Sequence, residues 1–475
     1  MDPKKDKEKQ EFQYLSRCLS KNSKLEDFEY SFPKGSQDAF QELMNEGKIY
    51  PKVTKLHVPL TRTLSRDGAR NFADHHDDDN EEIGEDEGND ENEEDDEEDS
   101  DDKPEKIKSL PLNTKTSDPS FRFHIFSNLK ALEIKAQKLD KKLYPDFGSS
   151  LAEAFEDLHY LKKLYLKLSS HPPGTDFILQ GLLKLPLLTS LSLRIDSMSL
   201  SQGDILNTFI KKQANLASMS LEIKCSTTDE LQENQFLENF LESHSHKPLL
   251  KHLTLNLNSW EAEYLSEGLK RLQGSDQIKA FELKIREFID CRPREKSFAG
   301  LCDFLLRNRN TLDDLALDLA LEPLYEVEMY DSMNSVIPQL TQLQHFDLRF
   351  YLNEHKMTRY LFDLDLKSIL LKLENLQRVV LNLDYLSEFP PECREWMVEC
   401  FTVLPLLKSL RKLEFSIPIE GLSRTEINMI TMGLKGLNRF VKMEFLNIDD
   451  LGFYEKETEE IVKVYWDVVE LQALL

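Results

Sequence analysis

The chain has 475 residues, of which 86 are acidic and 60 are basic, and its formal net charge is −26 at pH 7. Nineteen of the acidic residues lie between Asp77 and Asp102, which leaves −7 for the remainder and no basic block suited to double-stranded nucleic acid. No apolar run approaches the roughly 18 residues of a membrane span, and the N-terminus lacks the apolar region of a secretory signal, so we expect a cytoplasmic or nuclear protein without membrane contact.

In chain order, the first expected element is a charged helix within residues 1–24, where Phe12, Leu15 and Leu19 have helical spacing. From residue 25 onward one phrase recurs, apolar-x-x-apolar-x-apolar-x-apolar, whose alternating end has the period of a strand with one buried face. The phrases are LEDFEYSF from Leu25, VTKLHVPL from Val53, LKALEIKA from Leu129, LKKLYLKL from Leu161, LTSLSLRI from Leu188, LASMSLEI from Leu216, LKHLTLNL from Leu250, IKAFELKI from Ile278, LDDLALDL from Leu312, LQHFDLRF from Leu343, LQRVVLNL from Leu376, LRKLEFSI from Leu410 and FVKMEFLN from Phe440. All but one of the spacings between successive phrases fall between 27 and 34 residues, a period that chance would not maintain.

Between the phrases the apolar period changes to that of a helix. SQDAFQELMNEG would have Ser36 as its N-cap and Gly47 past its end, and GSSLAEAFEDLHY would be capped by Ser149 or Ser150. EAEYLSEGLKRL, EKSFAGLCDFLLRN and TEINMITMGLKGL are similar segments. Each unit is therefore predicted to contain one strand and one helix, which cannot bury their apolar faces alone but can do so in a stack.

This cadence resembles that of the leucine-rich-repeat superfamily, most closely its ribonuclease-inhibitor-type class. The resemblance implies an α/β fold, a leucine-rich-repeat solenoid of about 13 repeats in a curved arc, with a parallel sheet on the concave face and helices on the convex face. That class usually has Asn or Cys at the ninth position of the phrase, where Asn258 matches and Asp196 and Asp384 come near. We therefore expect irregular turns within the same fold.

The patterns predict five parts of the chain. Residues 1–24 form an N-terminal capping helix, 25–70 the first repeat units, 71–106 a disordered acidic insertion, 107–455 the leucine-rich-repeat solenoid, and 456–475 a C-terminal capping helix. Capping helices would cover the open ends of the core, although the last one could instead bind a partner. Whether Ile107 begins a further, weak repeat stays open.

The acidic run from Asp77 to Asp102 is too charged and too polar to pack. One interpretation is a solvated loop that the fold tolerates. The other is a capture site for a basic segment, such as a histone tail, a ribosomal protein or a basic part of this chain. The residues that represent this acidic loop are Asp77, Glu81, Glu85, Asp90, Glu94 and Asp99.

The sequence shows no constellation typical of an enzyme, since it lacks a P-loop, Gly-x-Ser-x-Gly, His-Glu-x-x-His and the kinase motifs. The six cysteines have no Cys-x-x-Cys spacing, and HSH at 244–246 has no Cys or carboxylate at a useful ligand spacing. We therefore predict no catalytic residue, no metal and no cofactor.

The predicted binding surface is the face of the sheet that points away from the helices, to which positions five and seven of each phrase project. The residues assigned to it are Glu133, Lys135, Tyr165, Lys167, Arg194, Glu282, Lys284, Asp347 and Arg349. Basic side chains recur at Lys135, Lys163, Lys167 and Arg194, which favours an acidic segment there, including the chain's own acidic run. The alternative is an ordinary solvated face.

The leading interpretation is a non-enzymatic scaffold for protein–protein interaction, monomeric by itself, that binds a protein partner on the concave face and a basic partner through the acidic loop. The alternative is a regulator of an enzyme, such as a GTPase activator of the Ran type or an inhibitor. Ran-type activators also combine such repeats with an acidic region, but none of their catalytic residues matches a position in this sequence.

Overall fold

The computed structural model describes residues 28–31, 53–61, 128–137, 146–169, 174–196, 198–223, 230–260, 262–274, 276–288, 298–321, 326–352, 364–382, 398–416, 422–437 and 441–445. The chain divides into two units, one made of Met1–Thr61 with Asp118–Leu475 and the other of Arg62–Ser117. All described residues belong to the first unit. None of the helices described is both long and apolar enough to pass through a bilayer.

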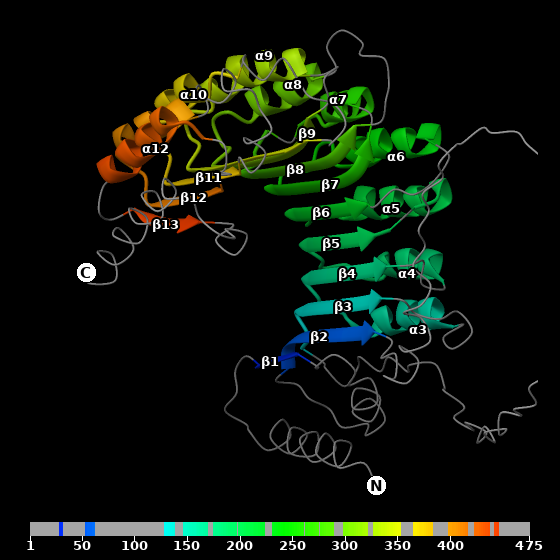
Figure 1. Cartoon of the computed structure of the whole chain (residues 1–475). Helices are drawn as coiled ribbons and strands as arrows, with labels where there is room; N and C mark the ends of the chain where they lie inside the picture. The colour runs from blue at the N-terminus through cyan, green and yellow to red at the C-terminus, as the bar shows by residue number, and fades with distance from the viewer. Residues whose placement is uncertain are drawn as a thin grey trace, which may run out of the picture. The chain divides into compact units, whose positions relative to one another are not determined.

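Strands and helices alternate along the described chain (Figure 1). The strands are β1 (Phe28–Ser31), β2 (Val53–Thr61), β3 (Ala131–Gln137), β4 (Lys163–Ser169), β5 (Ser190–Ile195), β6 (Ser218–Ile223), β7 (His252–Trp260), β8 (Ala280–Phe288), β9 (Asp314–Leu321), β10 (His345–Leu352), β11 (Arg378–Asn382), β12 (Lys412–Ser416) and β13 (Lys442–Phe445). The α-helices are α3 (Phe147–Ala154), α4 (Thr175–Leu182), α5 (Leu200–Lys212), α6 (Glu230–Ser243), α7 (Ala262–Arg271), α8 (Ala299–Arg307), α9 (Glu326–Val336), α10 (Leu366–Lys372) and α12 (Arg424–Gly436). Short 3-10 helices are η3 (Phe155–Asp157), η4 (Ile337–Gln339) and η7 (Leu404–Leu406).

The described strands form one sheet of 13 strands in the order β1 to β13, and neighbouring strands run parallel. Each of the phrases found in the sequence contains one of these strands, so the predicted repeat is confirmed. The register joins equivalent positions of successive phrases, for example Leu132 to Leu164 and Leu164 to Leu191. A strand, a helix and a return to the next parallel strand define a leucine-rich-repeat solenoid.

The core lies between the sheet and the helices, which occupy one side of it (Figure 1). On β5, Leu191, Leu193 and Ile195 are buried, whereas the intervening Ser192 and Arg194 are partly exposed. The same alternation recurs on β6. Each buried leucine side chain contributes about 1.5–3 kcal/mol to the stability of the fold. On these strands the two-residue period separates a buried face from a polar face, as the sequence predicted. On β11 and β12 it does not, because Val380, Glu414 and Ser416, at positions five and seven of their phrases, are also buried.

Serine caps begin two of the helices. Ser199 and Ser423 accept hydrogen bonds from the N3 backbone of α5 and α12, and each N3 side chain bonds back in a capping box. The predicted cap of α3 at Ser149 or Ser150 is wrong. The N-cap is Asp146, because the helix begins early enough to bury Phe147, and the Ser149 hydroxyl donates to the Asp146 carbonyl at 3.0 Å.

Side chains of one repeat satisfy the helix carbonyls of the repeat before it. The Lys247 ammonium donates to the carbonyls of Lys211 and Gln213 at 3.0 and 2.9 Å, at the end of α5. The Arg307 guanidinium donates to the Leu272 carbonyl at 2.9 Å, just after α7. Because unpaired carbonyls at a helix end are costly when buried, these bonds hold successive repeats together.

Two buried polar side chains lie in the turns between helix and strand. Asn308 accepts from the Ile278 amide and donates to the Phe304 carbonyl, both at 3.0 Å, and so joins the end of α8 to the preceding repeat. His244, the first histidine of HSH, is fully buried with Nδ1 2.8 Å from the Phe240 carbonyl oxygen. Burial lowers the pKa of His244 to about 4, so the ring is neutral at pH 7 and acts as a core residue.

Several predictions concern residues outside the described ranges and stay predictions. They are the N-terminal helix with Phe12, Leu15 and Leu19, the caps Ser36 and Gly47, the acidic loop, the weak repeat at Ile107 and the C-terminal helix 456–475. Much of the chain that follows each strand is also outside these ranges, so the expected irregular turns are untested.

Candidate protein-interaction surface

The open face is the side of the sheet opposite the helices (Figure 1). Positions three, five and seven of each phrase project to it, because successive side chains of a strand alternate between faces. The parallel register aligns these positions into three rows that cross the strands, here called row three, row five and row seven. Neighbouring members of a row are about 4.8 Å apart at the backbone.

Row seven contains three cations in register, Lys135 on β3, Lys167 on β4 and Arg194 on β5. The Lys135 ammonium forms an ion pair with Glu133 on its own strand, and Arg194 Nε lies 3.0 Å from a Glu222 carboxylate oxygen on β6. Like charges directly opposite each other destabilise a strand pair. This part of the row therefore places three positive charges side by side.

Tyr165 lies in row five of β4, between Lys163 in row three and Lys167 in row seven. The Lys135 ammonium is 5.8 Å from the centroid of its ring, within the range of a cation–π contact. Partial burial raises the pKa of the Tyr165 hydroxyl, although Lys135 and Arg194 act to lower it.

The basic patch is defined as Lys135, Lys163, Lys167 and Arg194. Across the described open-face positions of β3 to β6, these four cations face two carboxylates, Glu133 and Glu222. The surface of these strands is therefore net positive, whereas the chain as a whole is strongly negative.

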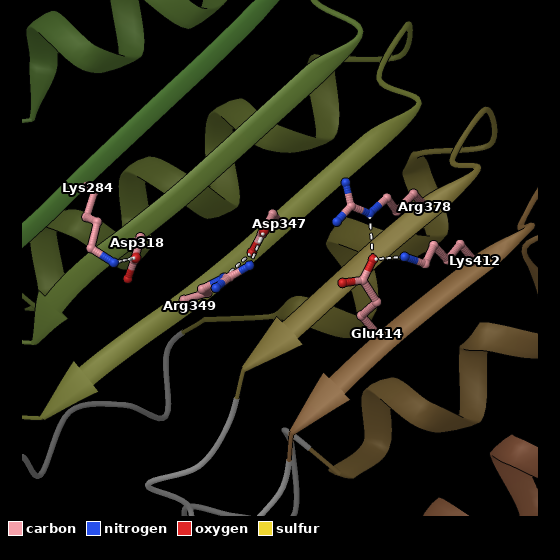
Figure 2. A network of polar contacts seen from close by, with 7 residues as sticks. All are labelled: Lys284, Asp318, Asp347, Arg349, Arg378, Lys412 and Glu414. Atoms are coloured by element: carbon pink, nitrogen blue, oxygen red, sulfur yellow. Dashed lines mark hydrogen bonds and ion pairs between the residues drawn. The ribbon is translucent and has the colours of Figure 1, made fainter. Parts of the chain in front are cut away.

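Row seven has the opposite character over β8 to β10, where Lys284, Asp318 and Arg349 alternate in sign (Figure 2). The Lys284 ammonium contacts the Asp318 carboxylate, and these side chains are only 17% and 11% exposed. Arg349 donates from Nε and Nη2 to the two oxygens of Asp347, both at 2.8 Å. Such a two-point contact fixes the guanidinium more firmly than a single bond would.

On the last strands one carboxylate joins two cations (Figure 2). Glu414 Oε1 on β12 lies 2.8 Å from Arg378 Nε on β11 and 2.8 Å from Lys412 Nζ. Burial would raise the pKa of Glu414, but the hydrogen bonds from Arg378 and Lys412 hold it below its usual value. The ion-paired ladder is the set of Lys284, Asp318, Asp347, Arg349, Arg378, Lys412 and Glu414.

In row five, from β5 to β7, the open face carries small uncharged side chains. Row five carries Ser192, Ser220 and Thr254 on β5, β6 and β7. The Thr254 hydroxyl donates to Glu282 Oε2 on β8 at 3.3 Å. Burial raises the pKa of Glu282, the Thr254 bond lowers it, and the nearby Asp347 raises it again.

The nine residues assigned to the surface from the sequence all lie on strands at open-face positions, and the structure brings them into two groups. The first group is Glu133, Lys135, Tyr165, Lys167 and Arg194; the second is Glu282, Lys284, Asp347 and Arg349. Their part in binding stays a prediction, as does that of the acidic loop residues, which are outside the described ranges.

Sequence reasoning did not assign four residues of the ladder to the site, namely Asp318, Arg378, Lys412 and Glu414. Arg378 and Lys412 occupy position three of the phrase, which the two-residue period also directs to the open face. Glu414 is position five of the phrase from Leu410. Among the described residues, no group of three or more His, Cys, Asp or Glu side chains is arranged to hold a metal ion.

No protein-family model matches the chain, and no curated protein matches it. Among solved structures, the leucine-rich repeat-containing protein LegL7 from Legionella pneumophila is similar over 68% of this chain and 95% of its own, with 15% sequence identity and a TM-score of 0.37. So weak a likeness carries no conclusion about function. The fold rests on the chain itself: its phrases, its parallel sheet and its stacked helices make it a leucine-rich-repeat solenoid with a polar open face.

Proposed function

We propose that the protein is a non-enzymatic scaffold that binds a protein partner across the open face of its sheet. The observation that carries this proposal is the continuous parallel sheet, whose polar rows lie opposite all the described helices. From β3 to β10 the sheet extends about 34 Å across the strands and about 20 Å along them. This is comparable with the roughly 800 Å² that each side of a stable interface buries.

The strands also preorganise the side chains that a partner would meet. Residues of the ion-paired ladder hold one another in position, and the Lys135 ammonium of the neighbouring strand lies over the Tyr165 ring. Side chains already fixed lose less conformational entropy on binding than free ones. A broad, polar sheet face with side chains held in position therefore suits a protein surface better than a small ligand, which prefers a mostly apolar pocket.

Binding of a partner to the open face can be tested by placing bulky side chains at its centre. Replacing Ser192 and Ser220 with Arg (Ser192→Arg, Ser220→Arg) puts bulk into row five without breaking an ion pair of the ladder. The matched control places the same residues on exposed helix positions, Thr208→Arg and Ser335→Arg. Affinity purification with quantitative mass spectrometry should show partners that are lost from the open-face variant and kept by the control. Partners kept by both variants would contradict the proposal.

We also propose that residues 77–102 capture a basic segment of a partner. Their 19 carboxylates would steer such a segment over a distance set by screening, about 8–10 Å at physiological salt. The test is binding of histone-like basic peptides to the intact chain and to a chain that lacks 77–102, across a salt series. Binding that is absent, or unchanged by the deletion, would refute the capture role.

The alternative function, a regulator of an enzyme, predicts a different experimental result. A GTPase activator should accelerate single-turnover GTP hydrolysis by Ran-like GTPases, whereas a scaffold should leave the rate unchanged.

A further inference from the structure

The three cations of row seven differ from every other charged part of that row. Lys135, Lys167 and Arg194 are direct neighbours across β3, β4 and β5, whereas Lys284, Asp318 and Arg349 alternate in sign. A like-charge row is unfavourable in a free sheet and becomes favourable when an anion lies across it.

We propose that the basic patch is a docking surface for a carboxylate-rich segment of a partner protein, lying across β3, β4 and β5. This inference rests on the proposed function and deepens it, because it names the strands and the chemistry of one binding region. Lys135, Lys167 and Arg194 would face the acidic side chains, and Lys163 would extend the positive surface to row three of β4.

The geometry fits an extended peptide. Three members of a row span about 10 Å across the strands, which equals about three residues of an extended chain at 3.3 Å each. Beside the row, Tyr165 offers an aromatic surface and Ser192 a hydroxyl at the neighbouring position of row five. A short acidic segment could therefore make charged contacts along row seven and neutral contacts along row five.

The residue types suit a segment with many carboxylates. Three of the four cations are lysines, which are point charges on flexible stems and adapt to carboxylates at uneven spacing. Arg194 adds a guanidinium, whose planar fork also matches a carboxylate.

Glu133 and Glu222 do not remove the positive surface. Each pairs with one end of the row, and these two side chains are 20% and 21% exposed. They hold Lys135 and Arg194 in position but leave the described open face of β3 to β6 with more cations than carboxylates.

Residues 77–102 have the same chemistry as the proposed ligand, so they enter the experiment as a competitor. The probe is a labelled 20-residue peptide rich in Glu and Asp and unrelated to this chain. Its dissociation constant is measured by fluorescence anisotropy at low and high salt, for the full chain and for the chain without 77–102.

The decisive variant is Lys163→Glu with Lys167→Glu, which reverses two charges of the patch on β4. Its matched control is Lys372→Glu with Lys435→Glu, which changes the net charge equally at exposed positions of α10 and α12. Circular dichroism confirms that both variants are folded.

We expect the full chain to bind the peptide more weakly as salt rises, and the deletion to bind it several-fold more tightly, since 19 negative charges that repel the peptide are gone. The patch variant should bind about tenfold or more weakly than wild type, and the control within about twofold. No binding by the full chain at low salt, or equal losses in both variants, would overturn the proposal. Peptide bound only after the deletion would also overturn it, because the chain's own run would then be the occupant.

This result is separable from the proposed function. If the peptide fails to bind but partners are still lost from Ser192→Arg with Ser220→Arg, the open face remains a binding surface and only the acidic-segment inference falls.

Discussion

The open face carries charge in two different ways. Over β8 to β12 the charged side chains of the ion-paired ladder satisfy one another, and the Lys284–Asp318 pair is largely buried. Over β3 to β5 three cations stand side by side; Glu133 and Glu222 pair with the outer two, and the Lys135 side chain is 45% exposed. Both regions share the same phrase and the same buried leucines. The difference shows that the fold requires apolar residues at the buried positions but does not require a particular charge at the open-face positions.

Energetics separates the regions further. An exposed ion pair contributes about 0–1 kcal/mol, whereas loss of one member of a buried pair leaves an uncompensated charge and costs several kcal/mol. The ladder should therefore matter for stability and the basic patch should matter little. If loss of a charge lowered the free energy of unfolding equally in the ladder and in the basic patch, the proposed difference between the two regions would be wrong.

The largest effect is expected at Glu414. Glu414→Gln would leave the Arg378 and Lys412 cations facing each other around a side chain that is 8% exposed. We expect a loss of about 2 kcal/mol in the free energy of unfolding, since both cations can partly escape to water. Urea denaturation followed by circular dichroism measures it. A loss of less than about 0.5 kcal/mol in the free energy of unfolding would show that the contacts of Glu414 with Arg378 and Lys412 do not stabilise the fold.

The contribution of Glu414 to stability should depend on pH. The pKa of Glu414 in the folded protein is below its usual value of 4.5, so its carboxylate stabilises the fold above that pH. This contribution falls as the pH drops from about 4.5 through the lower folded pKa, where the native state takes up the proton. The stability difference between wild type and Glu414→Gln should therefore shrink below pH 4.5. A difference that stays constant down to pH 3 would contradict this assignment.

A somewhat smaller effect is expected at the Lys284–Asp318 pair, because its loss leaves one buried charge unpaired and not two. Lys284→Gln should cost about 1–2 kcal/mol, and a double-mutant cycle with Asp318→Asn should give a coupling energy of similar size. Additive losses in the cycle would show that the two charges do not stabilise each other, despite their contact.

The smallest effect is expected in the basic patch. Lys163→Gln removes an exposed charge from β4 and should change the free energy of unfolding by less than about 0.5 kcal/mol. Lys284→Gln is the matched change in the ladder. A loss at Lys163 as large as the loss at Lys284 would mean that both regions are structural, and the basis for a binding patch would disappear.

Much of the fold was predictable because the relevant pattern is local. Leu191, Leu193 and Ile195 alternate with polar residues over six positions, so the strand and its buried face can be inferred without any neighbour. The start of α3 was not predictable from caps, because the burial of Phe147 against the core outweighed the preference for serine at an N-cap.

The same alternation predicts which residues lie on the open face. It predicts only some of the ion pairs that these residues form with one another. Aligned phrases already place Lys284 beside Asp318 in row seven. The contact of Arg378 with Glu414 crosses from row three to row five. It depends on the reach of two long side chains, which a phrase alignment does not contain.

The most direct test of the open face as a protein-binding surface is the ratio of partner recovery between two variants, Ser192→Arg with Ser220→Arg and Thr208→Arg with Ser335→Arg, each purified as the full chain. We predict that the open-face variant recovers a partner at least tenfold less than the helix-face control, because two bulky side chains block the centre of the interface. A ratio near one for every partner of the wild-type protein would contradict the claim that the open face binds proteins.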